Sequence, residues 1–334
     1  MNKRILGFSI LALSLTLVGC GENNEASPNS EENAEETVDE TTENTEAAET
    51  SETSTETTLT DSLGNEVVIP ANPERIIASY LEDYLVALGV SPVAQWSISD
   101  GAGIQDYLQE DLQDIPTIPF DLPFEAVTSF SPDLLLVGSA ETVGDGKYDQ
   151  YSKIAPTYVV GTEDSENWRE DLVEIAKVLN LNDEADQILE DYDAKAEESQ
   201  DIIKDSIGED SVAAVWLTGG QLFIVSETAS SGAVMYGDLG LASPDVVKEI
   251  SESATSDWSP ISLEEVAELD TEHLFLISSE LDDSIELLED PLWQNIPAVK
   301  NDQVYEYEST TSWLYNGPVA NDQIIDDVLE SLVE

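Results

Sequence analysis

The sequence predicts an α/β protein of two lobes, each with a central and mostly parallel sheet, joined by one long rigid helix. In residues 59–166 and again in residues 208–334, short apolar runs typical of buried strands alternate with helical segments, and this alternation favours parallel sheets. Residues 167–207 read as near-continuous helix, because apolar side chains recur there at helical spacing. We therefore expect an N-terminal lobe, a bridging helix and a C-terminal lobe with these bounds.

The N-terminal lobe is predicted to open with a β-hairpin, because two short alternating runs in residues 58–70 flank a Gly64-Asn65 turn. Strand and helix then alternate up to the bridging helix. The predicted elements are a strand at 75–79, a helix at 82–88 that ends at Gly89, a strand at 93–96, a helix from Phe124 and a strand at 134–138.

The C-terminal lobe is predicted to begin with two strands around a Thr-Gly-Gly turn and to end with a helix. One segment also repeats between the lobes, since residues 124–137 align without gaps with residues 263–276, and each copy reads as a helix start followed by a strand. This internal similarity favours pseudo-twofold architecture. The predicted strands of this lobe span 212–217, 222–225, 273–277 and 303–307, and its predicted helices span 233–239, 263–269 and 318–333.

The chain is strongly acidic, with 72 acidic and 11 basic residues among 334 and a formal charge of −61. This charge excludes electrostatic binding to nucleic acid or to an anionic lipid surface, since both need clustered Lys and Arg. Acidity is spread evenly over helical surface such as residues 184–201, and we interpret it as adaptation to a halophilic habitat, where salt screens self-repulsion. A habitat of high pH is the alternative. Residues 20–58 are acidic and lack aromatic side chains, which predicts a disordered tether.

The chain has one cysteine and one histidine, Cys20 and His273. This count excludes a disulfide within the chain and the usual zinc ligand sets. We therefore expect no metal site and no cofactor, and a metal ion that the protein handles should arrive already chelated. His273 opens a predicted strand and is interpreted as a half-buried structural residue.

The N-terminus reads as an export signal in residues 1–19. Lys3 and Arg4 precede an apolar stretch at 5–18 that is too short for a comfortable transmembrane helix. The sequence Leu-Val-Gly-Cys that ends at Cys20 resembles a bacterial lipobox, and this resemblance implies cleavage before Cys20 and attachment of lipid to it. A plain secretory signal is the alternative.

Six segments carry a family resemblance through their order and spacing along the chain. They are residues 60–77, 85–90, 125–136, 231–241, 296–305 and 312–318. With them the chain resembles the ferric-siderophore-binding lipoproteins of bacterial ABC importers. The resemblance implies two α/β lobes bridged by a rigid helix, with the ligand in the cleft between them.

The resemblance also implies partners and a location. The expected partners are a ferric siderophore and an ABC permease with its ATPase, and the expected location is the extracytoplasmic face of the cell membrane, reached through the lipid anchor. A monomer is expected. No Ser/His/Asp set, phosphate loop or spaced carboxylate pair stands out, so an enzyme is not predicted. Two alternatives remain open. The ligand could be cobalamin or haem, or the protein could be an extracellular sensor or adhesion module with the same fold.

A chelated ferric ion is large and partly apolar, which favours a cleft lined by aromatic faces. Such a cleft should lie at the carboxyl ends of the parallel strands. Trp258 and Trp313 are favoured as ligand-binding residues because both occur in polar segments, whereas Trp216 and Trp293 are assigned to packing. The full set of predicted ligand-binding residues is Trp313, Trp258, Trp96, Phe120, Tyr80 and Lys147.

The predicted cleft is poor in positive charge. Several relatives place an arginine just before the segment that corresponds to Gly232–Tyr236, whereas residues 227–231 here contain no base. Lys147 is one of few cations left for an anionic chelate, and a solvated loop lysine is the alternative reading. A neutral or weakly charged hydroxamate complex therefore fits this sequence better than a tricatecholate, and no direct bond between protein and iron is expected.

Glu125 and Glu264 occupy equivalent places in the repeated segment. The resemblance implies that one glutamate on each lobe docks into arginines of the permease. Ser262 and Glu265 form a predicted capping box that leaves Glu264 free to point outward. The alternative is a carboxylate that only stabilises the helix dipole.

Overall fold

The computed structural model describes residues 56–98, 101–161, 167–279 and 287–333. The predicted signal peptide, Cys20 and nearly all of the predicted tether lie outside these ranges. None of the helices formed by the described residues is both long enough and apolar enough to span a membrane.

The predicted hairpin is present, made by the antiparallel strands β1 (Thr57–Thr60) and β2 (Glu66–Ile69). The Asp61 carboxylate closes the turn by accepting hydrogen bonds from the backbone N–H groups of Leu63 and Asn65. The last residues of the predicted tether therefore belong to β1.

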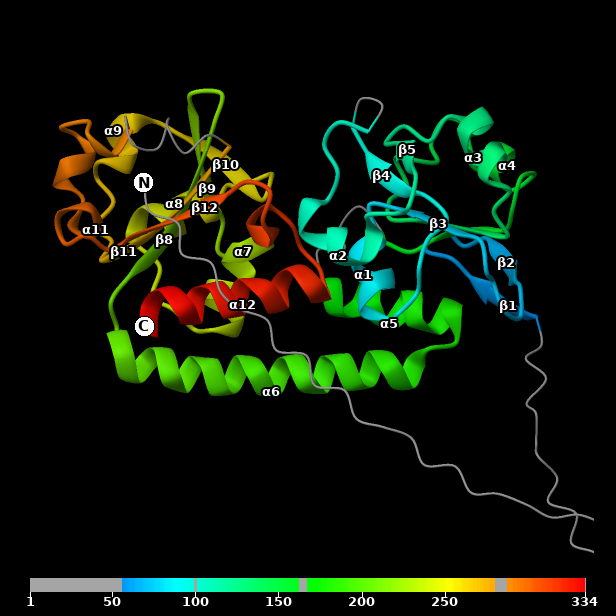
Figure 1. Cartoon of the computed structure of the whole chain (residues 1–334), viewed down its shortest axis with the longest axis horizontal. Helices are drawn as coiled ribbons and strands as arrows, with labels where there is room; N and C mark the ends of the chain where they lie inside the picture. The colour runs from blue at the N-terminus through cyan, green and yellow to red at the C-terminus, as the bar shows by residue number, and fades with distance from the viewer. Residues whose placement is uncertain (1–55, 99–100, 162–166, 280–286, 334) are drawn as a thin grey trace, which may run out of the picture. The chain divides into compact units, whose positions relative to one another are not determined.

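Parallel strands form the rest of the N-terminal lobe (Figure 1). One sheet has the order β3-β6-β7, and β4 pairs with β5. A parallel bridge between Ile77 and Ala94 joins the two groups. The strands are β3 (Ile76–Ser79), β4 (Gln95–Ser97), β5 (Thr117–Pro119), β6 (Leu134–Val137) and β7 (Thr157–Val159), and the helices are α1 (Glu82–Ala87), the 3-10 helix η1 (Asp106–Leu108), α2 (Gln109–Leu112), α3 (Phe124–Phe130) and α4 (Tyr148–Tyr151).

The single helix predicted at 167–207 is two helices. α5 (Trp168–Leu179) ends at Asn180, whose φ of 59° is left-handed, and α6 (Asn182–Ile207) begins beyond it. Asparagine tolerates this conformation and often ends helices for that reason. Figure 1 shows α5 beneath the N-terminal lobe, while α6 runs beneath both lobes. The bridging helix is therefore α6 alone.

The sheet of the C-terminal lobe is mixed rather than mostly parallel, with the order β10-β9-β8-β11-β12. β8, β11 and β12 are parallel, but β9 is antiparallel to both of its neighbours. The left-handed Gly219 and Gly220 make the predicted tight turn between β8 and β9. The strands are β8 (Val212–Thr218), β9 (Gln221–Val225), β10 (Trp258–Ile261), β11 (His273–Ser278) and β12 (Val304–Glu308).

The C-terminal helix packs on the bridging helix and also on the N-terminal lobe, because α12 contacts both α6 and α1. The segment predicted as helix 233–239 forms a π-helix, η2. The helices of this lobe are α7 (Ser230–Gly232), η2 (Ala233–Asp238), α8 (Asp245–Ser251), α9 (Leu263–Val266), η3 (Trp293–Asn295), α11 (Pro297–Lys300), η4 (Ser312–Leu314) and α12 (Pro318–Val333).

One hydrophobic core extends through both lobes. It includes the buried side chains of Leu85 in α1, Phe275 in β11 and Ile324 in α12. An ion pair adds to it, since Arg169 of α5 lies 3.0 Å from Asp238 of η2. Close packing and this ion pair therefore hold the lobes together.

Candidate functional site

An unusual turn lies at the carboxyl edge of the N-terminal sheet. Tyr80 lies between the end of β3 and the start of α1, and its φ of 64° is left-handed. This conformation is an outlier for a bulky residue, and strained backbone of this kind concentrates at functional sites. Tyr80 is nevertheless 52% exposed. It stands where open α/β sheets bind their ligands.

Tyr80 belongs to a group of four aromatic rings from both lobes. Its ring centroid lies 5.0 Å from that of Trp96 in β4 and 6.4 Å from that of Tyr315, which precedes α12. The Tyr315 ring lies 4.8 Å from that of Tyr107 in η1. Trp96, Tyr107 and Tyr315 are only half-buried. We call these four residues the interlobe aromatic cluster, and it retains accessible ring surface.

Two buried carboxyl groups lie beside the cluster at the start of α1. Glu82 Oε1 accepts a hydrogen bond of 2.6 Å from the Trp96 backbone N–H, whereas its buried Oε2 has no partner among the described residues. Asp83 accepts a hydrogen bond of 2.9 Å from the Tyr107 hydroxyl. Burial raises the pKa of Glu82 to about 8 and that of Asp83 to about 6. Glu82 is therefore mainly protonated at neutral pH.

The tyrosine hydroxyls of the cluster also stay protonated at neutral pH. Although Tyr80 as a whole is half exposed, desolvation of its hydroxyl is the main cause that raises its pKa to about 12. The charges of Tyr315 and of nearby acidic groups add to this shift. Burial likewise raises the pKa values of Tyr107 and Tyr315. A protonated phenol offers an apolar face and a hydrogen-bond donor. The cluster can therefore hold a partly apolar ligand that carries hydrogen-bond acceptors.

The geometry agrees with a comparison to protein families. A family model described as periplasmic binding protein matches residues 82–311, which is more than half of the chain. The chain belongs to this periplasmic binding protein family.

Individual relatives of this periplasmic binding protein cover almost the whole chain. The probable siderophore-binding lipoprotein YfiY of Bacillus subtilis (strain 168) is 25% identical over 98% of this chain and 98% of its own. The iron(3+)-hydroxamate-binding protein FhuD of the same organism is 25% identical over 98% of this chain and 96% of its own. The solved FhuD protein from S. pseudintermedius, at 21% identity, has a TM-score of 0.68 and covers 84% of this chain and 98% of its own. The structural likeness shows a shared fold.

The predicted ligand-binding residues of the N-terminal lobe lie in different places. Tyr80 and Trp96 belong to the interlobe aromatic cluster. Phe120 directly follows β5 at the same carboxyl edge and is 58% exposed. Lys147 directly precedes α4, which Figure 1 shows on the side of the N-terminal lobe away from α12. The fold therefore does not bring Lys147 to the cluster.

The prediction that Trp313 lines the cleft is wrong. Trp313 is fully buried and packs on Phe275 of β11 and Tyr307 of β12, with ring centroids 4.6 and 5.2 Å away. Its indole N–H donates a hydrogen bond of 2.8 Å to the Asp327 carboxylate. The polar sequence around Trp313 concealed this core position, because it depends on how β11 and β12 pack against this segment and not on a local apolar pattern. Tyr315 is the residue of this segment that joins the cluster.

Trp258 also lacks an open aromatic face. It begins β10 instead of lying in a loop, is 9% exposed, and packs edge-on against Trp216 at 6.1 Å. The prediction of packing roles for Trp216 and Trp293 is confirmed. Trp216 contacts Phe223, and Trp293 is fully buried in the core of the C-terminal lobe.

Sequence reasoning missed Tyr107, Tyr315, Glu82 and Asp83. Tyr315 could have been found, because it lies in one of the six segments that carry the family resemblance. No local pattern marks Tyr107. The two acids looked like ordinary first-turn carboxylates of α1, and only tertiary packing buries them.

Glu125 and Glu264 are both exposed, and each is the second residue of its helix, α3 or α9. Figure 1 shows α3 and α9 on the side of the two lobes away from α6. The predicted capping box is confirmed, since the Ser262 hydroxyl accepts from the Glu265 N–H at 3.2 Å and the Glu265 carboxylate accepts from the Ser262 N–H at 2.9 Å. Glu264 takes no part in it.

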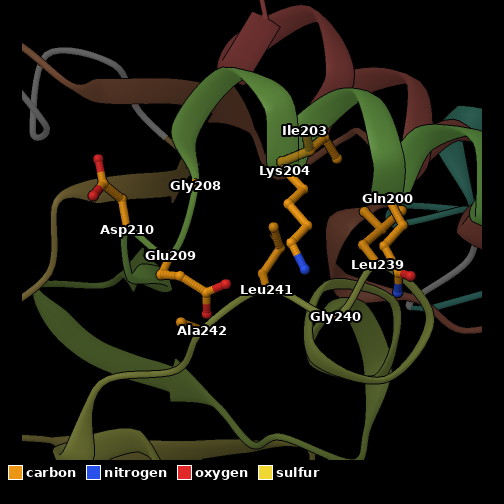
Figure 2. Close-up of a pocket in the computed structure, with 10 residues that line it drawn as sticks. All are labelled: Gln200, Ile203, Lys204, Gly208, Glu209, Asp210, Leu239, Gly240, Leu241 and Ala242. Carbon is orange, nitrogen blue, oxygen red and sulfur yellow. The ribbon is translucent and has the colours of Figure 1, made fainter.

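A cavity of about 210 Å³ lies at the end of α6, between its last turns and the segment 239–242 (Figure 2). It has no aromatic ring in its lining. Pockets for small-molecule ligands usually exceed about 300 Å³. This cavity is therefore smaller than a usual ligand pocket and offers no aromatic face.

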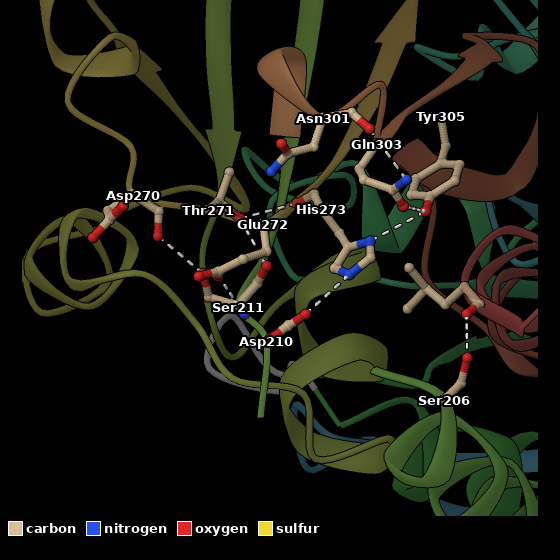
Figure 3. A network of polar contacts seen from close by, with 11 residues as sticks. Ser206, Asp210, Ser211, Asp270, Thr271, Glu272, His273, Asn301, Gln303 and Tyr305 are labelled. Atoms are coloured by element: carbon tan, nitrogen blue, oxygen red, sulfur yellow. Dashed lines mark hydrogen bonds and ion pairs between the residues drawn. The ribbon is translucent and has the colours of Figure 1, made fainter. Parts of the chain in front are cut away.

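His273 is 7% exposed, which is deeper than predicted, and belongs to a polar network (Figure 3). Its Nδ1 lies 3.1 Å from the Tyr305 hydroxyl, and its Nε2 lies 3.8 Å from the Asp210 carboxylate just beyond α6. Burial lowers the pKa of the imidazole, and the charge of Asp210 opposes this shift. Within the ranges described, no group of three His, Cys, Asp or Glu side chains could hold a metal ion.

Proposed function

We propose that this protein is an extracytoplasmic solute-binding lipoprotein that captures a ferric siderophore, favouring the hydroxamate type, and delivers it to an ABC permease with its ATPase. The observation that carries the proposal is the interlobe aromatic cluster, because both lobes of a periplasmic binding protein contribute rings to one partly exposed site. YfiY is named a probable siderophore-binding lipoprotein and FhuD an iron(3+)-hydroxamate-binding protein, and these names support siderophores as the ligand class.

The chemistry of the cluster suits a metal ion that remains inside its chelate. The aromatic faces pack on the organic shell, and the protonated Tyr80 hydroxyl donates to hydroxamate oxygens. We propose no bond between protein and iron, no cofactor and no catalytic activity. The protein acts as a monomer, since the cluster is complete within one chain.

The proposal also covers how the protein is held at the membrane and the habitat in which it works. Lipid attached to Cys20 holds the protein at the extracytoplasmic face of the cell membrane, and residues 20–56, which precede β1, act as its tether. The charge of −61 is adaptation to high salt. Exposed Glu125 and Glu264, one on each lobe, then pair with arginines of the permease.

Intrinsic tryptophan fluorescence tests ligand capture, because Trp96 lies within the cluster. We expect ferrichrome, a neutral ferric trihydroxamate, to quench this fluorescence saturably. Tyr80→Ala and Tyr315→Ala should each weaken binding by about 1–3 kcal/mol, as for a lost aromatic contact at the centre of a site. Tyr148→Ala is the matched control, since Tyr148 is half-buried in α4 away from the cluster.

The absence of binding by ferrichrome and every other ferric hydroxamate would contradict the proposed ligand class. Normal binding by both cluster variants would instead show that the ligand sits elsewhere. Thermal unfolding of each variant separates loss of the site from loss of the fold.

A further inference from the structure

The carboxylate of Asp83 connects the two lobes and is hidden from solvent, since the residue is only 2% exposed. Within the N-terminal lobe, its Oδ2 accepts a hydrogen bond of 2.9 Å from the Tyr107 hydroxyl. From the C-terminal lobe, the backbone N–H groups of Val319 and Ala320 at the start of α12 donate to Oδ1 and Oδ2 at 2.8 and 2.9 Å. One buried carboxylate therefore joins an aromatic residue of one lobe to a helix of the other.

The segment that carries Tyr315 is fastened to the same end of α12. The side-chain N–H of the buried Asn321 donates a hydrogen bond of 3.2 Å to Asn316 Oδ1, and its backbone N–H donates one of 2.9 Å to the Gly317 carbonyl. Pro318, the first residue of α12, restricts the backbone further because its ring fixes φ. The position of the first turn of α12 therefore sets the position of Tyr315.

Asp83 thus acts on both members of one ring pair of the interlobe aromatic cluster. The ring centroids of Tyr107 and Tyr315 lie 4.8 Å apart, and the two rings come from different lobes. The Tyr107 hydroxyl has one proton to donate and gives it to Asp83, while its oxygen accepts from Gln105 Nε2 at 3.3 Å. Aromatic contacts depend on the offset and tilt of the rings, so movement of either ring would change the surface that a ligand meets.

We propose that Asp83 is a positioning residue of the ligand site, which holds Tyr107 and Tyr315 together across the lobes and thereby sets the affinity for the ferric siderophore. Its effect on the ligand is indirect, because the carboxylate is buried and its two oxygens already accept from three donors. The inference rests on the proposed function. It adds a residue that acts through two others.

Asp83→Asn tests the proposal, because asparagine keeps the shape of the side chain but replaces one acceptor oxygen with an NH2 donor. We expect the affinity for ferrichrome to fall roughly two- to tenfold, the range that loss of one aromatic pair gives. Trp313→Phe is the control, since it removes another hydrogen bond to a carboxylate, that of Asp327, outside the cluster. Both variants should lose stability, but only Asp83→Asn should lose affinity.

Tyr107→Phe provides a milder test, because it removes the hydroxyl that donates to Asp83 and keeps the ring. It should weaken ferrichrome binding by about twofold or more. Tyr151→Phe is the matched control, since the buried Tyr151 belongs to α4 outside the cluster and its hydroxyl donates a hydrogen bond of 2.8 Å to the Leu122 carbonyl. The test therefore does not depend on whether Asp83→Asn folds.

A double-mutant cycle separates positioning from a general effect on the fold. The ring pair is already absent in Tyr315→Ala, so Asp83→Asn or Tyr107→Phe should reduce affinity clearly less in that background than in the unmodified protein. In the Tyr148→Ala background, which leaves the cluster complete, the full reduction should persist.

Unchanged affinity of folded Asp83→Asn and Tyr107→Phe variants would overturn the positioning role while leaving siderophore capture intact. An equal loss of affinity in the Tyr315→Ala and Tyr148→Ala backgrounds would also overturn it, because the effect would then not pass through the ring pair. If the unmodified protein binds no ferric hydroxamate, the proposed function fails, and this inference fails with it.

Discussion

The carboxylate of Asp83 occupies the space that a Cβ atom would need at Gly317. A Cβ at Gly317 would lie 2.5 Å from Asp83 Oδ1, and the φ of Gly317 is 155°. Asp83 comes from α1 of the N-terminal lobe, yet it accepts hydrogen bonds of 2.8 and 2.9 Å from the N–H groups of Val319 and Ala320 at the start of α12. One lobe thus caps a helix of the other, and glycine permits the approach.

Gly317→Ala should therefore lower the free energy of unfolding by about 1–3 kcal/mol, because the methyl group displaces the capping carboxylate. Urea denaturation measures the change. Gly146→Ala is the matched control, since Gly146 also has a positive φ, of 77°, but nothing lies within 4 Å of its Cβ position. Equal effects of the two substitutions would show that backbone strain, and not the Asp83 contact, fixes glycine at 317.

Trp313 should matter for stability and not for ligand binding. Trp313→Phe removes the N–H that donates to Asp327, and we expect a loss of about 1–3 kcal/mol in unfolding free energy with nearly unchanged ligand affinity. Tyr315→Ala should show the opposite pattern. Chemical denaturation and fluorescence titration of the two variants measure both quantities. If a Trp313→Phe variant is stable but binds the ligand weakly, Trp313 contributes to ligand binding after all.

Glu82 should make stability depend on pH. Its pKa rises from 4.5 to about 8 on folding, so between these values the folded state binds more protons than the unfolded state. The unfolding free energy therefore falls as pH rises from about 5 to about 8, by a few kcal/mol at about 1.4 kcal/mol per pKa unit. Glu82→Gln should flatten this slope.

Glu197→Gln is the control for that experiment, because Glu197 is an exposed acid of α6. It also removes one carboxyl group, but from a position that solvent reaches in the folded protein. Identical slopes in the two variants, measured by urea denaturation at several pH values, would rule out Glu82 as the source.

Reversal of charge at Glu125 and Glu264 should separate capture from delivery. The double variant Glu125→Arg, Glu264→Arg should abolish uptake of the ferric siderophore by cells. The affinity of the purified variant for the siderophore and its thermal stability should remain nearly unchanged, because both residues are exposed. Each single reversal should give a partial loss. Glu141→Arg with Glu268→Arg, also exposed, is the control. Normal transport by the Glu125→Arg, Glu264→Arg variant would show that these glutamates do not dock with the permease and only interact with the dipoles of their helices.

Cys20→Ala should release the protein from membranes into the medium, since Cys20 is the only thiol and the proposed attachment point of lipid. Fractionation of cells that express each form measures this. The released protein should keep its affinity for ferrichrome, because Cys20 precedes the folded lobes. Tight membrane association of the variant would contradict lipid anchoring at this residue.

The sequence by itself determined the order of the elements, the two lobes and the chain's charge. Strand and helix periods are local properties of side-chain spacing, so β3, α1, β6 and the final helix α12 appear close to their predicted bounds. The capping box at Ser262 was predictable for the same reason, because its partners lie three residues apart.

The tertiary structure alone decided which aromatic and acidic residues form the site. Trp313 and Tyr315 are two residues apart in similar polar sequence, yet one is in the core and the other in the cluster. Likewise, Asp83 became a helix cap only when α12, more than two hundred residues later in the chain, packed beside it. Whether a side chain is buried depends on packing between segments that can be far apart in the sequence. Local sequence patterns do not contain this information.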